Sequence, residues 1–255
     1  MENMNYGNWV RTKVLWFLGI ITLVFGAFVL VRVPTEFRIF FGILALGSLV
    51  SFLFPMYSYF MFSHKGGNMQ DKFYDLILAP LENHNRGKML VIGAGNGILA
   101  TKAAIRNPAL DVVGMDYWGK DWEYSKTVCE QNARVGKVAD RAHFQKGDAA
   151  SLNFPDATFD IVVSNLTFHE VKMVKRKNEV LQEALRVLKP GGKFVFIDYF
   201  YEDRYYGNVE DFKHSLESLP LQEVALKPLH DVMTVSRLLR HPRALGRVGI
   251  VLGRK

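Results

Sequence analysis

The sequence has very little cysteine, with Cys129 the single example among 255 residues. One thiol excludes an internal disulfide framework and a zinc site built from cysteines. The His, Asp and Glu residues form no group with the spacing of metal ligands, so we expect no metal site. Internal repeats and low-complexity segments are also missing. About 190 residues follow an apolar N-terminal region, and this length is enough for one domain with a substantial core.

Charge is missing from two long stretches near the N-terminus. Val14–Val31 and Ile39–Phe62 contain 18 and 24 residues without a charged side chain. A bilayer core about 30 Å thick needs roughly 20 apolar residues in a helix, so both stretches qualify as spans. The short connector between them predicts a helical hairpin. We therefore expect transmembrane helices over about 14–31 and 39–62, in a membrane-anchoring domain of residues 1–65.

Pro55 lies inside the second stretch and should kink that helix or end it early. A cleaved signal peptide is an alternative for the first stretch, but no good cleavage site follows it. A buried hairpin in a soluble protein is another alternative. The Lys and Arg residues outside the stretches mildly favour both termini in the cytoplasm, so the prediction is an integral, two-pass membrane protein with a cytoplasmic catalytic domain.

The net charge of +7 has two interpretations. It is either a solubilising excess or an attraction to anionic lipid headgroups. Nucleic-acid binding is not expected, because the basic residues are scattered rather than clustered with aromatics. The segment Val232–Arg247 carries four arginines among apolar residues, and it predicts either a surface helix at the headgroups or a solvated helix.

Residues 66–255 alternate between strand and helix patterns. This alternation predicts an α/β fold: a Rossmann-like, mostly parallel sheet of seven strands with an antiparallel last strand. Ligands then bind at the carboxyl ends of the strands. The expected strands are Lys88–Ile92, Asp111–Met115, Ala142–Gln145, Phe159–Ser164, Lys193–Ile197, Gln222–Leu226 and Gly249–Leu252. The expected helices are Ile98–Arg106, Trp122–Val135, Glu179–Leu188 and Val209–Leu216.

The first two strands end in residues suited to a nucleotide-like ligand. The first is followed by Gly93-Ala94-Gly95-Asn96-Gly97, where glycines allow a tight turn and a close approach of the backbone. The G-x-G-x-G spacing departs from the G-x-G-x-x-G of dinucleotide folds. Asp116 ends the second strand and can accept hydrogen bonds from two ribose hydroxyls. Tyr117 and Trp118 follow it and can flank an adenine.

The next two strands end in polar residues as well. Asp148 and Ala149 come just after the third strand, where a carboxylate can receive an adenine amino group. Asn165 ends the strand FDIVVS. Each residue alone could be a turn or cap residue. Four such signals at the ends of four successive strands indicate a ligand site.

The sequence resembles the class I S-adenosylmethionine-dependent methyltransferases, and it is most similar to the small-molecule branch that includes quinone C-methyltransferases. GDAASLNFPDATFDIVVSN and LQEALRVLKPGGKFVFID carry the resemblance, within about Lys88–Asp198. It implies the cofactor S-adenosylmethionine. The glycines of the motif would approach its methionine part, Asp116 would hold the ribose, Asp148 and Ala149 would meet the adenine, and Asn165 would line the site near the sulfonium.

One position departs from the family pattern. The family usually has an acidic residue two positions before the first glycine, and Val91 stands there in this sequence. That carboxylate commonly helps to hold the methionyl amino group. The departure puts in doubt how that group is held, but not the class of cofactor.

A catalytic base is needed only if the acceptor carries a proton. His169, four residues past Asn165, is a candidate because its pKa would suit a base. The alternative is a histidine that shapes the loop or the wall of the acceptor pocket. Asp198, at the end of KFVFI, is a second candidate catalytic residue, whereas Glu170 is expected to be a surface or cap residue.

Three functions are consistent with these features. The first is methyl transfer to a lipophilic or membrane-delivered small molecule, with membrane lipid as a partner and a homo-oligomer formed through the apolar helices as a further expectation. The second is methylation of a soluble small molecule or protein, with the hairpin serving only to localise the enzyme. The third is a non-catalytic, cofactor-binding membrane subunit. The sequence does not name the acceptor.

Overall fold

The computed structural model describes residues 4–82, 86–119 and 123–255. By its contacts the chain divides into two compact units. One comprises Tyr6–Asp71, and the other comprises Met1–Asn5 together with Lys72–Lys255. The functional division into residues 1–65 and 66–255 remains a prediction.

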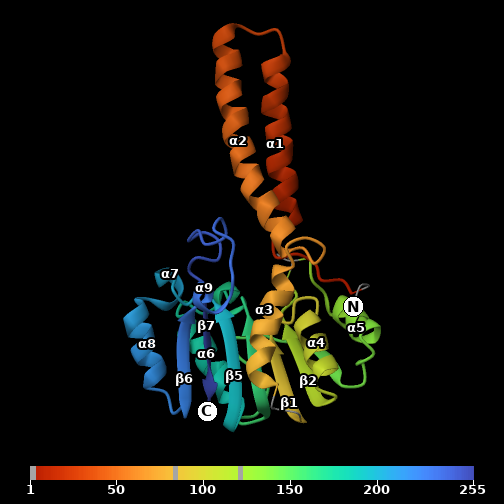
Figure 1. The fold of residues 1–255 in the computed structure, drawn as a ribbon, viewed down its shortest axis with the longest axis vertical. Coiled ribbons are helices and arrows are strands. Elements are labelled where there is room, and N and C mark those ends of the chain that lie inside the picture. The colour runs from red at the N-terminus through yellow and green to blue at the C-terminus, as the bar shows by residue number, and fades with distance from the viewer. Residues whose placement is uncertain (1–3, 83–85, 120–122) are drawn as a thin grey trace. The chain divides into compact units, whose positions relative to one another are not determined.

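The unit Tyr6–Asp71 is built on two long helices, α1 (Thr12–Leu30) and α2 (Thr35–Phe62). They lie side by side (Figure 1), and the rings of Phe28 and Phe41 stack at 4.5 Å between centroids. Both helices are long and apolar enough to cross a membrane, and neither apolar stretch is buried. Large apolar side chains such as Leu30, 87% exposed, therefore cover the outside of the pair.

Pro55 does not end α2 early, because the helix continues for another seven residues to Phe62. Near the end of α2 lies a small polar cluster formed by the side chains of Tyr6, His64 and Asp71. The hydroxyl of Tyr6 donates to Asp71 at 2.9 Å, and Nδ1 of His64 lies 2.9 Å from the other oxygen of that carboxylate. The first and last residues of the unit are thus hydrogen-bonded to each other.

The second unit is a seven-stranded sheet with the order β3-β2-β1-β4-β5-β7-β6. The pairings among β1 to β5 are parallel, whereas β7 runs antiparallel to both β5 and β6. This is the expected Rossmann-like methyltransferase sheet, shown in Figure 1. The strands are β1 (Arg86–Ile92), β2 (Ala109–Asp116), β3 (Ala142–Lys146), β4 (Phe159–Asn165), β5 (Leu188–Asp198), β6 (Glu223–Pro228) and β7 (Gly249–Arg254).

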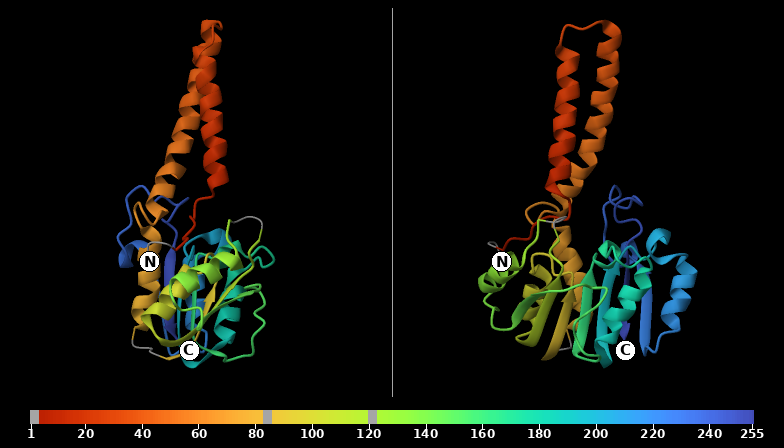
Figure 2. Two further views of the ribbon diagram at one scale, coloured as in Figure 1. Left: turned by 90° about the vertical axis from the view of Figure 1, so that its right-hand side faces the viewer. Right: turned by 180° about the vertical axis from the view of Figure 1, so that it is seen from behind.

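Both faces of the sheet are buried. Successive strand residues point to opposite faces, and Met89, Leu90, Val91 and Ile92 are all at most 1% exposed. Leu90 and Ile92 join a core with α6 and α8, so Met89 and Val91 face the other side. The helices, seen around the sheet in Figure 2, are α3 (Met69–Leu78), α4 (Ile98–Arg106), α5 (Lys126–Val135), α6 (Lys177–Arg186), α7 (Asp203–Tyr206), α8 (Val209–Glu217) and α9 (Leu229–Val232), with 3₁₀ turns η1 (Ala79–Leu81) and η2 (Phe168–Glu170).

Three of the helices expected in residues 66–255 differ from the structure by two residues or more. The helix expected over Glu179–Leu188 is α6, which starts and stops two residues earlier, because Leu188 already pairs with Phe159 in β5. The fifth helix begins at Lys126, and Trp122, where we expected its start, lies outside the described residues. The helix expected over Val232–Arg247 is wrong, since α9 ends at Val232 and turns follow it.

Candidate active site

The glycine loop after β1 has a left-handed backbone at all three glycines, with φ of +76° at Gly93, +55° at Gly95 and +76° at Gly97. Their surroundings differ. A Cβ on Gly93 would stand 1.8 Å from the hydroxyl oxygen of Thr167, and one on Gly97 would stand 2.9 Å from Phe144. A Cβ on Gly95 would meet only the ring of Tyr124, at 3.8 Å. Of these three glycines, Gly95 alone leaves room for a ligand where a side chain would stand.

Asp116, at the end of β2, holds this loop. One carboxylate oxygen accepts a hydrogen bond from the N–H of Gly95 at 2.8 Å, and the other accepts one from the N–H of Trp118 at 2.8 Å. The indole N–H of Trp118 donates in turn to the carbonyl of Gly95 at 2.9 Å. Burial raises the pKa of Asp116, and these backbone hydrogen bonds offset part of the rise. Each of the two oxygens keeps a further lone pair that can accept another hydrogen bond.

The residues expected near an adenine lie on the same edge of the sheet. Asp148 accepts a hydrogen bond from the N–H of Ala150 at 2.9 Å, so one of its oxygens stabilises its own turn. Ala149 is buried. Tyr117 is 63% exposed, with the Lys146 ammonium 5.1 Å from its ring centroid. Among these side chains, Tyr117 is the one most open to a ligand.

Asn165 ends β4 beside the glycine loop, since β4 pairs with β1. Its side-chain oxygen is buried and has no hydrogen-bond partner among the described residues. The next residue, Leu166, has a φ of +50°, a left-handed conformation that is uncommon outside glycine. This turn places Thr167 over Gly93 and carries the chain on to His169.

His169 and Asp198, the two candidate catalytic residues, are in direct contact. Nδ1 of His169 lies 2.6 Å from a carboxylate oxygen of Asp198, whose other oxygen accepts from the backbone N–H of His169 at 3.0 Å. The N–H of Tyr199 donates to the first oxygen at 2.7 Å. The side chains of His169 and Asp198 are 12% and 1% exposed. Because a carboxylate only accepts, Nδ1 carries the proton, and Nε2 is the nitrogen that can exchange one.

The environment makes this histidine more basic than usual. Burial lowers the pKa of His169. The charge and hydrogen bond of Asp198, with a smaller contribution from Glu170, outweigh this effect and raise the pKa to about 9. A carboxylate oxygen of Glu170 lies 3.6 Å from Nε2 of His169, and the Glu170 side chain is 36% exposed. Two aromatic rings complete the surroundings, with Tyr199 at 4.7 Å and Tyr205 at 5.5 Å between ring centroids. The aromatic residues that follow β5 in sequence were the available signal for them.

A buried asparagine in α5 also supports the glycine loop, and sequence analysis did not identify it. The amide of Asn132 donates to the carbonyl of Asn96 at 2.8 Å. The same side chain pairs with the backbone of Asn5, accepting from its N–H at 2.8 Å and donating to its carbonyl at 2.9 Å. The N-terminal residues thus reach the loop through one side chain.

Comparison with known proteins agrees with this geometry. Residues 90–196 match a family model described as a methyltransferase domain. The 27-O-demethylrifamycin SV methyltransferase of Amycolatopsis mediterranei is 33% identical over 112 residues, which is 44% of this chain and 38% of that protein. The ubiquinone/menaquinone biosynthesis C-methyltransferase UbiE of Geotalea daltonii is 29% identical over 114 residues, covering 44% of this chain and 46% of that protein. The chain thus spans less than half the length of these relatives.

The fold recurs among solved structures. The crystal structure of the 4+2-cyclase SpnF superposes with a TM-score of 0.53 and 17% identity, covering 72% of this chain and 80% of that one. At this identity the likeness concerns the fold alone, and a cyclase on the same fold illustrates that the fold does not fix the reaction. The match of residues 90–196 identifies a methyltransferase domain. The sheet order and the glycine loop held by Asp116 are consistent with it. Residues 90–196 thus carry a methyltransferase domain, and over this segment the chain is similar to class I, S-adenosylmethionine-dependent methyltransferases.

Proposed function

We propose that the protein is a membrane-anchored methyltransferase that moves a methyl group from S-adenosylmethionine to a lipophilic or membrane-delivered small molecule. The observation that carries the proposal is the pair α1 and α2, whose apolar stretches are unburied and lie in the same chain as a methyltransferase domain. Such helices are stable in a bilayer and costly in water. The anchor would keep the acceptor site close to substrates dissolved in the membrane.

The residues around the glycine loop fit the cofactor. Gly95 leaves its backbone open, and the carboxylate of Asp116 has lone pairs to spare. The buried oxygen of Asn165 has no protein partner among the described residues, which is unusual for a buried polar atom unless a ligand supplies one. We propose that these three residues hold the cofactor, with Tyr117 and Asp148 on the adenine side. When bound, S-adenosylmethionine supplies a methyl group on a sulfonium that is already activated for displacement.

In this proposal the protein mainly orients the acceptor and controls one proton. Positioning alone can contribute about 7–11 kcal/mol to lowering a barrier. Nε2 of His169 takes the proton of an acceptor hydroxyl or acidic carbon, while Asp198 fixes the orientation of the ring through Nδ1. The alternative, in which His169 only shapes the wall of the acceptor pocket, uses the same contacts without a proton transfer.

The membrane topology is part of the proposal. Both helices would cross the bilayer, and the methyltransferase domain would lie in the cytoplasm, where the weak bias of the basic residues puts it. The partners would be membrane lipid and a small lipophilic acceptor, and the helices would be the place for association with a second copy.

Full-length protein in lipid nanodiscs tests the proposal. It is incubated with S-adenosylmethionine and with either a lipid extract or an aqueous extract, both prepared from one batch of cells. We expect S-adenosylhomocysteine to accumulate, and one compound in the lipid extract to gain the mass of a methyl group. Methylation confined to the aqueous extract would favour a soluble acceptor. Cofactor binding without turnover in either extract would favour a non-catalytic subunit.

A further inference from the structure

Two loops at the carboxyl edge of the sheet have an unusual composition. The first, residues 171–176, follows η2, and the second, residues 233–248, leads into β7. Both contain several basic residues, and neither contains an acidic or an aromatic residue. We call their exposed Lys, Arg, Met and Leu side chains the basic rim, which consists of Lys172, Met173, Lys175, Arg176, Arg237, Leu238, Arg240 and Arg243.

Each loop presents a large apolar side chain to the surroundings. Met173 is 85% exposed and Leu238 is 61% exposed, each with basic residues close by in sequence. An isolated exposed apolar residue needs no explanation. Here the same combination occurs in two loops that are distant in sequence, and apolar groups among basic ones are typical of surfaces that contact a bilayer interface.

The first loop is held in place by a buried lysine. Lys177 is buried, and its ammonium donates to the carbonyls of Val171 and Val174, on either side of Met173. Val171 and Val174 pack against the core. Burial lowers the pKa of Lys177 in this position. The loop therefore does not fold Met173 inward, because its neighbours on both sides are fixed to the domain.

The second loop is fixed in the same way. Leu239 and Leu245 are buried, while Leu238 between Arg237 and Leu239 points outward. Arg240 donates to the carbonyl of Val235 at 3.1 Å. The buried leucines and this hydrogen bond therefore hold the loop in a conformation that keeps its outer side chains exposed.

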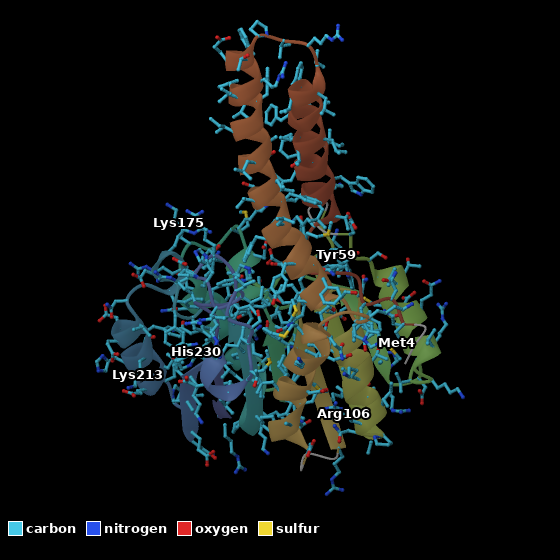
Figure 3. The ribbon with its side chains drawn as sticks, turned by 45° about the horizontal axis from the view of Figure 1, so that its top comes forward. Met4, Tyr59, Arg106, Lys175, Lys213 and His230 are labelled. Atoms are coloured by element: carbon cyan, nitrogen blue, oxygen red, sulfur yellow. The ribbon has the colours of Figure 1, made fainter. Side chains whose placement is uncertain are left out.

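Both loops border the pair of His169 and Asp198. The first begins two residues after His169. The second is tied to the segment after Asp198, because the N–H of Tyr201 donates to the carbonyl of Arg247 and the guanidinium of Arg247 donates to the carbonyl of Tyr201, both at 3.1 Å. The rim therefore flanks the acceptor side of the candidate active site. Figure 3 shows Lys175 among the side chains of this region.

We propose that the basic rim contacts the anionic headgroups of a bilayer, with Met173 and Leu238 entering the interface, so that the acceptor reaches the site from the headgroup layer. Lys and Arg near an anionic leaflet are attracted to it, and this attraction fades within a Debye length. The absence of aromatic residues from both loops argues against a single-stranded nucleic acid, which is usually bound by stacking. The entry route rests on the proposed function, whereas the contact with the bilayer does not.

Fluorescence of the full-length protein in nanodiscs tests the contact. An environment-sensitive dye is attached to Leu238→Cys, and in a second protein to Lys213→Cys on α8, outside the rim (Figure 3). Cys129 is buried, so the parent protein should label poorly. We expect the emission at 238 to shift to shorter wavelength when anionic lipid replaces part of the neutral lipid, and to return in 1 M salt. Emission at 213 should not change.

A charge reversal completes the test. Arg237→Glu should reduce the shift at position 238 severalfold, and Lys213→Glu should leave it unchanged. Arg237→Glu should also raise the KM for a bilayer-dissolved acceptor about tenfold, at constant kcat. Equal emission in neutral and anionic nanodiscs would overturn the proposal, as would a shift produced by a soluble polyanion but not by lipid. The dye reports without methyl transfer, so failure of the proposed function alone would leave the emission shift intact.

Discussion

The two halves of the carboxyl edge of the sheet are built differently. Around β1 and β2 the carboxylate of Asp116 accepts hydrogen bonds from the backbone, from the N–H groups of Gly95 and Trp118. Around β4 and β5 the titratable side chains contact each other, as His169 and Asp198 do. The first half is a preformed backbone cradle suited to one cofactor. The second is a cluster of side chains, which in the proposed function meets the acceptor.

The largest expected effect is on the side-chain half. If His169 is the base, His169→Ala should lower kcat about 10²–10⁴-fold while cofactor affinity holds, the usual range for general base catalysis. If it shapes the pocket wall, KM should change more than kcat. His214→Ala, an exposed histidine on α8, is the control. Loss of cofactor binding in His169→Ala would contradict the separation of the two halves.

The backbone half should respond in cofactor affinity. Asp116→Ala removes the acceptor proposed for the ribose hydroxyls and the tie to Gly95. Hydrogen bonds to charged groups contribute about 1.5–3 kcal/mol, so the Kd for S-adenosylmethionine should rise roughly 10- to 100-fold by calorimetry. Asp111→Ala, on the same strand, should change it little. An unchanged Kd in Asp116→Ala would refute the ribose assignment.

Glycine substitutions separate folding from binding within the loop. Gly97→Ala should lower the free energy of unfolding by about 1–3 kcal/mol, because φ at Gly97 is +76° and the new Cβ would press on Cys129 and Phe144. Gly95→Val also strains the backbone, because φ at Gly95 is +55°, but its side chain would meet no neighbour closer than the ring of Tyr124, so its distinctive effect should be to block the close approach of the cofactor. Chemical denaturation and calorimetry measure the two effects. Normal cofactor binding by Gly95→Val would make the motif a purely structural turn.

The pH dependence of activity should change when Asp198 is replaced. If His169 is the base, activity rises with pH until its pKa of about 9 is passed. Asp198→Asn removes the charge that raises this pKa, so the inflection should move to lower pH. Stability has the opposite sign: a raised pKa stabilises the fold below about 6.5, the ordinary histidine value, and the contribution is lost as pH rises through about 9. A profile that keeps its form in Asp198→Asn would favour the pocket-wall role.

The smallest effect is expected at the N-terminus. Asn5→Pro removes the N–H that Asn132 accepts, and one neutral hydrogen bond contributes about 0.5–1.5 kcal/mol. The Kd for cofactor should therefore rise about two- to tenfold. Asn5→Ala keeps both backbone contacts and should bind normally. Equal affinities for the two variants would show that Asn132 supports the loop without Asn5.

The sheet was predictable from sequence because its signals are local. A buried strand followed by a glycine or an acid is visible in a few residues, as at Gly93 and Asp116. The contact of His169 with Asp198 was not, since 29 residues separate them and the pairing depends on β4 lying beside β5. Both had been candidates for separate reasons.

Other differences also come from tertiary contacts. Asn132 looked like an ordinary polar residue on an amphipathic helix, but the packing of α5 buries it against the loop. The arginine spacing after Val232 suggested a helix, yet Pro242 and Gly246 suit turns, and the buried Leu239 and Leu245 hold the loop in that form. Of the two effects expected of Pro55, an early end of α2 does not occur, because the helix continues to Phe62.

The position of Asn5 has a consequence for how the protein is made. Met4 and Asn5 belong to the same compact unit as residues 72–255, so both ends of the α1–α2 hairpin lead into one folded domain. A chain inserted with a single crossing would put these parts in different compartments and leave Asn132 without Asn5. Removal of α1 by a signal peptidase would separate Asn5 from the domain that contains its partner Asn132. For the proposed anchor, insertion of the hairpin as a pair is therefore the route that keeps Asn5 beside Asn132.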